Sequence, residues 1–360
     1  MGKASSKTSY RKKASSKLRA IDFFCSIGGM TYGFTKAGVN VIAGIDIDPS
    51  CKETYEYNNK NSRFIEADIR GYTFEDLKND TGIKENDNDL VFIGCSPCQY
   101  WSIIKTDKTK SETTKNLLTD FQRFVEHFKP GYIVVENVPG IMKREKESGL
   151  THFIDVLQKY NYKVVKDILN ANYFGVPQTR RRFTLVASRV NDNISLPEKN
   201  TYEKNIVREY IGEWNGFPKI KAGHTDNTKL KHTAAGLSEN NLKRIKLTKK
   251  NGGTREKWGQ DEKLQIEAYK GKDYSFRNVY GRMSWDKPAP TITTRFNSLS
   301  NGRFGHPEED RALSLREGAT LQTFPKNYDF KEESKNAVAK HIGNAVPPKL
   351  AYHIAKQLLI

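Results

Sequence analysis

The segment Asp22-Phe23-Phe24-Cys25-Ser26-Ile27-Gly28-Gly29-Met30 joins a short apolar run to a stretch of helix length. A glycine-rich turn between a first strand and its helix brings backbone N–H groups and a helix N-terminus close to a bound ligand. The spacing is not Gly-x-Gly-x-x-Gly, so it does not specifically indicate a dinucleotide. It does predict the first strand, turn and helix of an α/β fold.

Short apolar runs alternate with helix-length segments from residue 19 to about residue 190. Leu117–Phe128 and His152–Tyr160 have the amphipathic pattern of helices. This alternation predicts a doubly wound, mostly parallel, Rossmann-like sheet covered on both faces. The runs predicted to be buried strands are Arg19–Phe24, Val41–Ile45, Arg63–Ile65, Leu90–Ile93, Tyr132–Val135, Tyr162–Ile168 and Phe183–Ala187.

The chain divides into three parts by composition. Residues 1–18 are basic and rich in Ser, which is typical of a flexible arm. The composition fits an arm that binds a polyanion and equally fits a solvated tail without a function. Residues 19–185 and 336–360 are predicted to form the larger domain. Residues 186–335 are predicted to form a smaller second domain, with a polar, variable core at about 191–275.

Isolated apolar side chains are expected to anchor this second domain, and the chain is expected to end in a helix that packs back on the first. The anchors are Trp214, Phe217, Ile245 and Trp258, and the terminal helix is Pro348–Leu359.

The net charge of +18 is large for a soluble enzyme. It fits a polyanionic partner such as nucleic acid, and composition alone fits a solubilising surface equally well. No apolar stretch reaches the length of a membrane span and the N-terminus has no apolar signal core, so a protein inside the cell is expected. All of the cysteines, Cys25, Cys51, Cys95 and Cys98, lie in the first hundred residues, which indicates a reducing compartment. Cys95 and Cys98 have no second ligand pair nearby, so no metal is predicted.

Acidic residues stand at the ends of the next two predicted strands. Asp46 lies roughly 20 residues beyond the glycine turn, where a carboxylate suits two ribose hydroxyls. Asp68 follows the third strand, where it could meet an adenine amino group. Together with the turn they favour an adenosine-containing cofactor over ordinary loop chemistry.

A thiol and a carboxyl group follow the fourth and fifth strands. Cys98 comes after Pro97, which restricts the backbone and can hold the thiol outward, and Glu136 comes directly after Val135. Side chains at the carboxyl ends of parallel strands meet at one edge, so the two form a plausible reaction pair. The alternative for Cys98 is a small buried apolar residue.

Ordered motifs from about residue 19 to the C-terminus resemble those of the DNA cytosine-5 methyltransferase family, excepting the variable stretch near 191–275. Ser26 stands where the family usually has glycine, and we expect altered cofactor contacts rather than lost binding. The matching motifs are Phe24 with Gly28-Gly29, Pro97-Cys98-Gln99, Glu136-Asn137-Val138, Gln178-Thr179-Arg180-Arg181-Arg182, Arg316-Glu317-Gly318-Ala319-Thr320-Leu321-Gln322-Thr323-Phe324-Pro325 and Gly343-Asn344-Ala345-Val346-Pro347-Pro348.

The resemblance implies a methyl transfer to carbon 5 of cytosine through a covalent adduct of Cys98 at carbon 6. Glu136 would hold the ring nitrogen and the exocyclic amine, which requires a raised pKa. Arg180 would meet the carbonyl oxygen of the base, and Arg182 would assist it. A generic phosphate clamp is the alternative for both arginines, and Arg181 is expected to point to the opposite face of its strand.

The resemblance also implies the cofactor S-adenosyl-L-methionine, with S-adenosyl-L-homocysteine as product. Phe24 and Leu117 could equally be ordinary core residues. The predicted cofactor residues are Phe24, Ser26, Gly28, Gly29, Asp46, Ile47, Asp68, Leu117 and Asn344.

The implied partner is double-stranded DNA, from which the target base must be flipped out. Tyr100–Asn116 is a candidate for a loop that closes over the DNA, and the second domain would read the sequence. The expected setting is the cytoplasm and nucleoid of a prokaryote, as a monomer in a restriction–modification system or without a cognate endonuclease. The rival interpretations are a transfer RNA methyltransferase, disfavoured because no cysteine follows Cys98, a catalytically silent DNA-binding relative and a C-x-x-C oxidoreductase.

Overall fold

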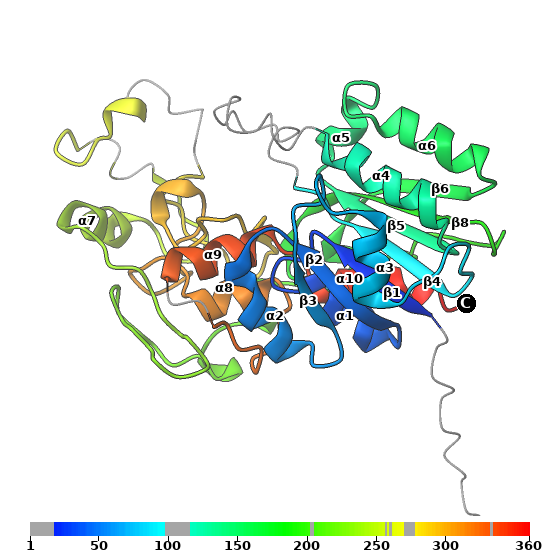
Figure 1. Ribbon diagram of the computed structural model, residues 1–360. Coiled ribbons are helices and arrows are strands. Elements are labelled where there is room, and N and C mark those ends of the chain that lie inside the picture. Colours follow the sequence, from blue (N-terminus) through cyan, green and yellow to red (C-terminus); the bar gives the residue numbers. More distant parts are fainter. Residues whose placement is uncertain are drawn as a thin grey trace, which may run out of the picture.

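A seven-stranded sheet forms the centre of the larger domain (Figure 1). The computed structural model describes residues 18–97, 116–201, 205–255, 258, 261–269, 278–331 and 334–360. The strand order is β3-β2-β1-β4-β5-β8-β6, in which β8 runs antiparallel to both of its neighbours and the other pairs are parallel. This confirms the predicted mostly parallel sheet. The strands are β1 (Arg19–Phe23), β2 (Asn40–Asp46), β3 (Arg63–Glu66), β4 (Leu90–Gly94), β5 (Tyr132–Asn137), β6 (Lys163–Asn170) and β8 (Arg181–Ser188).

Helices cover both faces of this sheet. Alternate side chains of β1 take part in different cores: Ala20 packs with the α1 and α10 side, whereas Ile21 packs with the α4 and α6 side. Burial on both faces explains why the central strands read as continuous apolar runs. The prediction that Tyr162–Ile168 is a buried strand is wrong, because β6 lies at the edge of the sheet and is mostly half-buried or exposed. No helix in the described residues is long and apolar enough to span a membrane. The helices are α1 (Gly29–Ala37), α2 (Lys52–Asn58), α3 (Phe74–Thr81), α4 (Leu117–Phe128), α5 (Gly140–Lys143), α6 (Leu150–Lys159), α7 (Glu239–Leu247), α8 (Leu315–Leu321), α9 (Lys335–Asn344) and α10 (Pro348–Gln357).

The C-terminal helix α10 packs along α1, as expected from its amphipathic pattern. The contact is close because α1 presents Gly33 there. A Cβ atom at this position would lie 2.4 Å from the carbonyl oxygen of Pro348 and 2.5 Å from the Cβ of Ala351. The last segment of the chain therefore completes the core beneath β1.

Among the residues described beyond position 190, little regular structure occurs apart from α7 and helices α8 to α10. A two-stranded pair, β7 (Gln178–Thr179) with β9 (Ala289–Pro290), connects it to the sheet domain. Phe217, Ile245 and Trp258 are buried as expected, but the prediction that Trp214 is a core anchor is wrong. Trp214 is 56% exposed and leans on the ring of Trp285 at a centroid distance of 5.0 Å, so it covers a core residue from outside.

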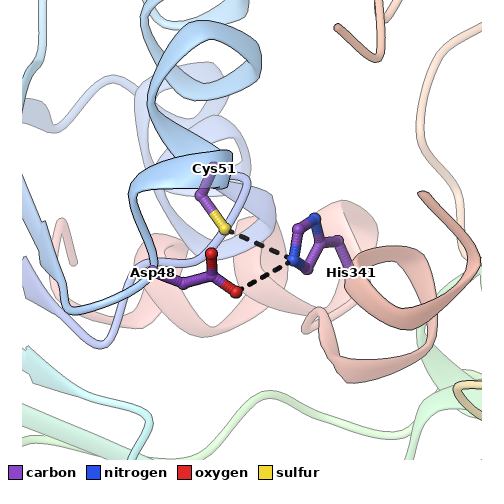
Figure 2. Close-up of side chains that lie close together, drawn as sticks. All are labelled: Asp48, Cys51 and His341. Atoms are coloured by element: carbon purple, nitrogen blue, oxygen red, sulfur yellow. Dashed lines mark hydrogen bonds and ion pairs between the residues drawn. The ribbon is translucent and has the colours of Figure 1, made fainter. Parts of the chain in front are cut away.

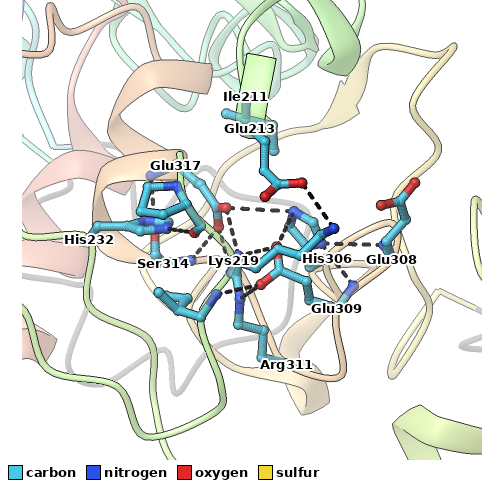
Figure 3. Close-up of polar contacts among 12 residues, drawn as sticks. Ile211, Glu213, Lys219, His232, His306, Glu308, Glu309, Arg311, Ser314 and Glu317 are labelled. Atoms are coloured by element: carbon cyan, nitrogen blue, oxygen red, sulfur yellow. Dashed lines mark hydrogen bonds and ion pairs between the residues drawn. The ribbon is translucent and has the colours of Figure 1, made fainter. Parts of the chain in front are cut away.

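A buried ionic network fixes the start of α8 in this region (Figure 3). The guanidinium of Arg311 donates to both carboxylate oxygens of Glu317, at 2.7 and 2.8 Å. Ser314 caps the helix and is itself contacted by Nδ1 of His232 at 2.8 Å. Because Glu317 belongs to a predicted motif, its position indicates a structural task for that motif.

Candidate cofactor and catalytic site

The turn after β1 is held in a strained conformation. Phe24, Ser26 and Gly28 all have positive φ, of 63°, 47° and 85°. The carboxylate of Asp46 fixes the turn, because it accepts hydrogen bonds from the backbone N–H of Ser26 at 2.8 Å and of Asp48 at 2.9 Å. Strained backbone of this kind persists where the surrounding structure over-determines it, which is common at ligand sites.

Two adjoining cavities open at this edge of the sheet, with volumes of about 330 and 200 Å³. They share Phe24, Asp46, Ile47 and Pro97 as a common wall. The larger cavity is also lined by the predicted site residues Ser26, Gly29, Glu136, Arg180, Arg182 and Asn344, and the smaller one by Asp68 and Leu117. Residues distant in the sequence are thus brought together as the resemblance implied.

Three predicted cofactor residues, Ile47, Asp68 and Gly28, differ in exposure and contacts in or behind these walls. Ile47 is 59% exposed although it is large and apolar, which suits a residue that packs against a ligand. Asp68 is engaged by Arg70, and the hydrogen bond from that guanidinium lowers the pKa of the carboxyl group. Gly28 lies behind the wall as the N-cap of α1, where a Cβ atom would lie 2.5 Å from the side chain of Asn59.

Glu136 and Arg182 form a buried ion pair in the larger cavity. Nε of Arg182 lies 3.2 Å from Oε1 of Glu136, and the two side chains are 14% and 8% exposed. Thr184 on β8 lies directly opposite Glu136 on β5. Arg182 is two residues from Thr184 on the same strand, so its side chain is on the same face of the sheet as Glu136 and diagonally next to it. Burial raises the pKa of Glu136, and the positive charges of Arg182 and Arg180 oppose that rise. The carboxyl group is therefore held closer to its protonated form than an ordinary glutamate.

Arg180 has a different environment from the one that the motif suggested. It donates to the carbonyl oxygens of Ile292 at 3.0 Å, Gly343 at 3.2 Å and Ala345 at 2.9 Å. The sequence assigned the charge beside the base to Arg180, whereas in the structure Arg182 is the arginine that contacts Glu136. Arg181 is exposed, on the other side of the strand as expected.

Two glutamines of the motifs extend this frame. Nε2 of Gln178 donates to Oε1 of Gln322 at 2.6 Å, and Oε1 of Gln178 accepts from the backbone N–H of Ile292 at 3.0 Å. Gln322 in turn donates to the carbonyl oxygens of Ile342 and Ala345. These buried amides tie β7, α8 and the end of α9 together around the cavity.

Asp22 is a cavity residue that the sequence-based assignment missed. Its Oδ2 accepts from Thr31, but its buried Oδ1 has no hydrogen-bond partner within the part of the chain that the structure describes. Burial raises the pKa of Asp22 to about 7, although the bonds from Thr31 lower it. The available signal was a charged residue inside the apolar run of β1, a position where burial of a carboxylate needs a reason.

The predicted nucleophile Cys98 and the predicted closing loop up to residue 115 lie outside the described residues. Cys95, Ser96 and Pro97, which immediately precede Cys98 in the chain, line the larger cavity. The amide of Asn137 donates to Oγ of Ser96 at 3.2 Å, which links the segment after β4 to the end of β5.

A mostly parallel sheet with a cavity at the ends of its first strands defines the Rossmann-like fold of S-adenosylmethionine-dependent methyltransferases. The model of the C-5 cytosine-specific DNA methylase family matches residues 18–359, and the chain belongs to that family as a type II DNA cytosine-5 methyltransferase. This confirms the predicted resemblance and enzyme class.

Relatives and solved structures agree with the assignment. The type II methylase M.HgiDII of Herpetosiphon aurantiacus is 40% identical over 343 residues, which cover 94% of each chain. The type II methyltransferase M1.HphI of Haemophilus parahaemolyticus is 31% identical over 95% of this chain and 87% of its own. An E. coli structure, described as a DNA modification methyltransferase encoded within a prophage, shares the fold with a TM-score of 0.72 and 20% identity, over 95% of this chain and 98% of its own.

Proposed function

We propose that the two cavities hold S-adenosyl-L-methionine and that the flipped cytosine enters beside Glu136. When bound, S-adenosyl-L-methionine supplies the electrophilic methyl group that carbon 5 of cytosine accepts, and S-adenosyl-L-homocysteine is left. The unpartnered oxygen of Asp22 supports this assignment, because a buried carboxylate at the cavity wall suits a ligand that carries positive charge.

The wall residues can be assigned to parts of the cofactor. Phe24, Ile47 and Leu117 present apolar surface for the adenine ring, and Asp68 lies at the same cavity for its amino group. Asp46 would accept from the ribose hydroxyls. Ser26, Gly28 and Gly29 form the turn and the start of α1, which would lie beside the anionic end of the cofactor; the backbone N–H of Ser26 itself is donated to Asp46. Asn344, at the end of α9, closes the opposite wall.

In this proposal Glu136 and Arg182 bind the base. A protonated Glu136 would donate its O–H to the ring nitrogen and accept from the exocyclic amine, while Arg182 would donate to the carbonyl oxygen. Burial raises the pKa of Glu136, which favours the protonated form that this contact needs. Arg180 acts through the backbone it holds, so we assign it a positioning role.

Cys98 is the nucleophile by its motif. Its thiolate adds to carbon 6 of cytosine, which makes carbon 5 nucleophilic as Glu136 protonates or holds the ring nitrogen. After carbon 5 has been methylated, loss of its proton restores the double bond and expels Cys98. The ion pair of Glu136 with Arg182 carries this proposal, since it sets a neutralisable carboxyl group and a fixed positive charge on one face of the site.

The domains, the substrate and the setting of the enzyme are also part of the proposal. We propose that residues 19–185 and 336–360 form the catalytic domain, that residues 186–335 form the target-recognition domain, and that residues 1–18 add charge for the DNA backbone. The enzyme would act as a monomer on double-stranded DNA at the nucleoid of a prokaryotic cell. A cognate endonuclease that cuts the same site would complete a restriction–modification system.

A methyl-transfer assay tests these assignments. Mixed duplex DNA is incubated with radiolabelled S-adenosyl-L-methionine and the wild-type chain, Cys98→Ser or Glu136→Gln, and the bases are separated. We expect label in 5-methylcytosine with the wild type, none with Cys98→Ser, and a rate lower by about 10²-fold or more with Glu136→Gln. Label from Cys98→Ser at the wild-type rate, or a Glu136→Gln variant of unchanged rate, would contradict the assignment.

A further inference from the structure

Three side chains of metal-ligand type converge at the wall of the larger cavity (Figure 2). Nε2 of His341 lies 3.7 Å from Sγ of Cys51 and 3.3 Å from Oδ2 of Asp48. His341 comes from α9, whereas Asp48 and Cys51 come from the turn after β2. Cys51 and His341 are 1% and 2% exposed, so the protein holds this arrangement rigidly.

The contacts differ from those of a Cys-His-Asp relay. In a relay the thiol and the carboxylate bind different nitrogens of the imidazole. Here both approach the same nitrogen, Nε2, as Figure 2 shows. One nitrogen has either one proton or one lone pair, so it cannot make a good hydrogen bond to both partners. A cation between the three atoms would be bound by all of them, in place of the contacts that Ser26 and Lys340 make with Cys51 and Asp48.

The distances from Nε2 of His341 to the other two donor atoms fit tetrahedral coordination. Zn–S and Zn–N or Zn–O bonds of about 2.3 and 2.0–2.2 Å place neighbouring donor atoms of a tetrahedron roughly 3.3–3.6 Å apart. The observed separations of 3.7 and 3.3 Å are close to these values, and all three donor atoms lie within 4.8 Å of one another. A thiolate with an imidazole selects zinc over magnesium or calcium.

We propose that Asp48, Cys51 and His341 form a site for Zn²⁺ with its fourth position open to the cavity. This departs from the absence of metal predicted from the Cys95 and Cys98 spacing. The site has a built-in competitor, because Nζ of Lys340 lies 3.1 Å from Oδ2 of Asp48. The side chain of Lys340 is 52% exposed, so it can move into solvent when a metal takes its place.

The second cluster of this kind in the described residues, His306 with Glu309 and Glu317, does not carry the same inference. The guanidinium of Arg311 already binds both of its carboxylates, at 2.7 to 3.1 Å. A fixed cation therefore occupies the place of a metal there, whereas the side chain of Lys340 beside Asp48 is half exposed.

Cobalt absorption tests the site without reference to catalysis. The full chain is freed of metal with a chelator and titrated with Co²⁺ alone, and the thiolate charge-transfer band and the visible bands of tetrahedral cobalt are recorded. We expect saturation at about one equivalent and displacement by Zn²⁺. Cys51→Ala and His341→Gln should lose the bands, whereas Cys25→Ala, which removes a different buried thiol, should keep them.

Lys340→Met provides a test that leaves all three ligands in place. Removal of the competing ammonium should tighten cobalt binding by about tenfold, which is the effect of roughly 1.4 kcal/mol. Circular dichroism checks that each variant is folded. Absence of the bands in the wild type, or bands that Cys95→Ala removes and Cys51→Ala retains, would overturn the proposal.

Zinc in this site should oppose cofactor binding, because its ligands line the cavity assigned to S-adenosyl-L-methionine. This consequence depends on the proposed function, unlike the cobalt titration. At a zinc concentration ten times its own dissociation constant, the Kd for S-adenosyl-L-methionine should rise about tenfold in calorimetric titrations, and it should be insensitive to zinc in Cys51→Ala. A zinc-independent Kd alongside positive cobalt bands would overturn the antagonism and leave the metal site standing.

Discussion

Arg180 and Arg182 are separated by one residue, yet the structure gives them different surroundings. Arg180 supports three backbone carbonyls, so Arg180→Met should leave buried acceptors unpaired and lower the free energy of unfolding by about 2–5 kcal/mol. Arg182→Met should lower it by under about 1 kcal/mol, because Glu136 can neutralise itself by taking up a proton. Urea unfolding of both variants measures this difference.

In catalysis, unlike in stability, Arg182→Met should be the more strongly affected of the two variants. With unfolding stability taken into account, Arg182→Met should slow single-turnover methyl transfer by about 10²-fold or more, because the variant has no positive charge beside the base. Equal destabilisation of both variants with little kinetic effect in Arg182→Met would show that Arg182 is only a structural partner of Glu136.

The pKa of Glu136 makes a prediction about pH. Burial raises this pKa, so the protonated carboxyl group persists to higher pH than in an ordinary glutamate and is lost as pH rises further. The single-turnover rate of the wild type should therefore fall as pH rises through this raised pKa. Glutamine cannot ionise, so Glu136→Gln should be slower throughout but should lack that fall. A fall at the same pH that survives in Glu136→Gln would assign it to another group.

At the scale of elements, the packing of α1 against α10 depends on Gly33. Gly33→Ala would place a methyl group 2.4 Å from the carbonyl oxygen of Pro348, so the helices must separate. We expect a decrease of about 1–3 kcal/mol in unfolding free energy, measured by thermal or urea melting. Gly71→Ala is the matched control, because its new Cβ would meet no atom closer than 4.0 Å. Equal stability of the two variants would contradict this close packing.

Individual strands were easier to predict than the way in which they pair in the sheet. The apolar runs located every strand of the large sheet. The central strands are buried on both faces and need no polar alternation, whereas the edge strand β6 is mostly half-buried or exposed. The place of β8 between β5 and β6, antiparallel to both, could not be predicted, because periodicity carries no information on pairing.

The site shows the same division between local and long-range information. Motif order located part of the cavity wall, but the role of Arg180 depends on Ile292 and Ala345, which lie 112 and 165 residues further along the chain. Trp214 was misplaced because hydrophobicity alone does not tell an inner core residue from one that covers the core. His341 had one local signal, since it precedes Asn344 by one helical turn on α9.

At the scale of the whole molecule, the net charge of +18 predicts that DNA binding depends much more strongly on salt concentration than cofactor binding does. Each phosphate neutralised by Lys or Arg contributes a slope of about −0.9 to log K against log salt concentration, so 6–10 such phosphates give about −5 to −9. We expect duplex binding, followed by fluorescence anisotropy between 50 and 200 mM NaCl, to weaken by about 10³–10⁵-fold. Binding of S-adenosyl-L-methionine in the same buffers should change by less than about threefold, because few phosphate-like charges are exchanged.

The basic arm offers a finer test of the same idea. Residues 1–17 carry Lys and Arg side chains and no acid, so a chain that begins at residue 18 should bind duplex DNA with a slope shallower by about 0.9 for each phosphate that the arm neutralises in the full chain. Methyl transfer at saturating DNA should be unchanged, because the arm is proposed only to add charge for the DNA backbone. An unchanged slope would identify the arm as a tail that does not bind DNA, and the charge of residues 18–360 would then account for the whole salt dependence.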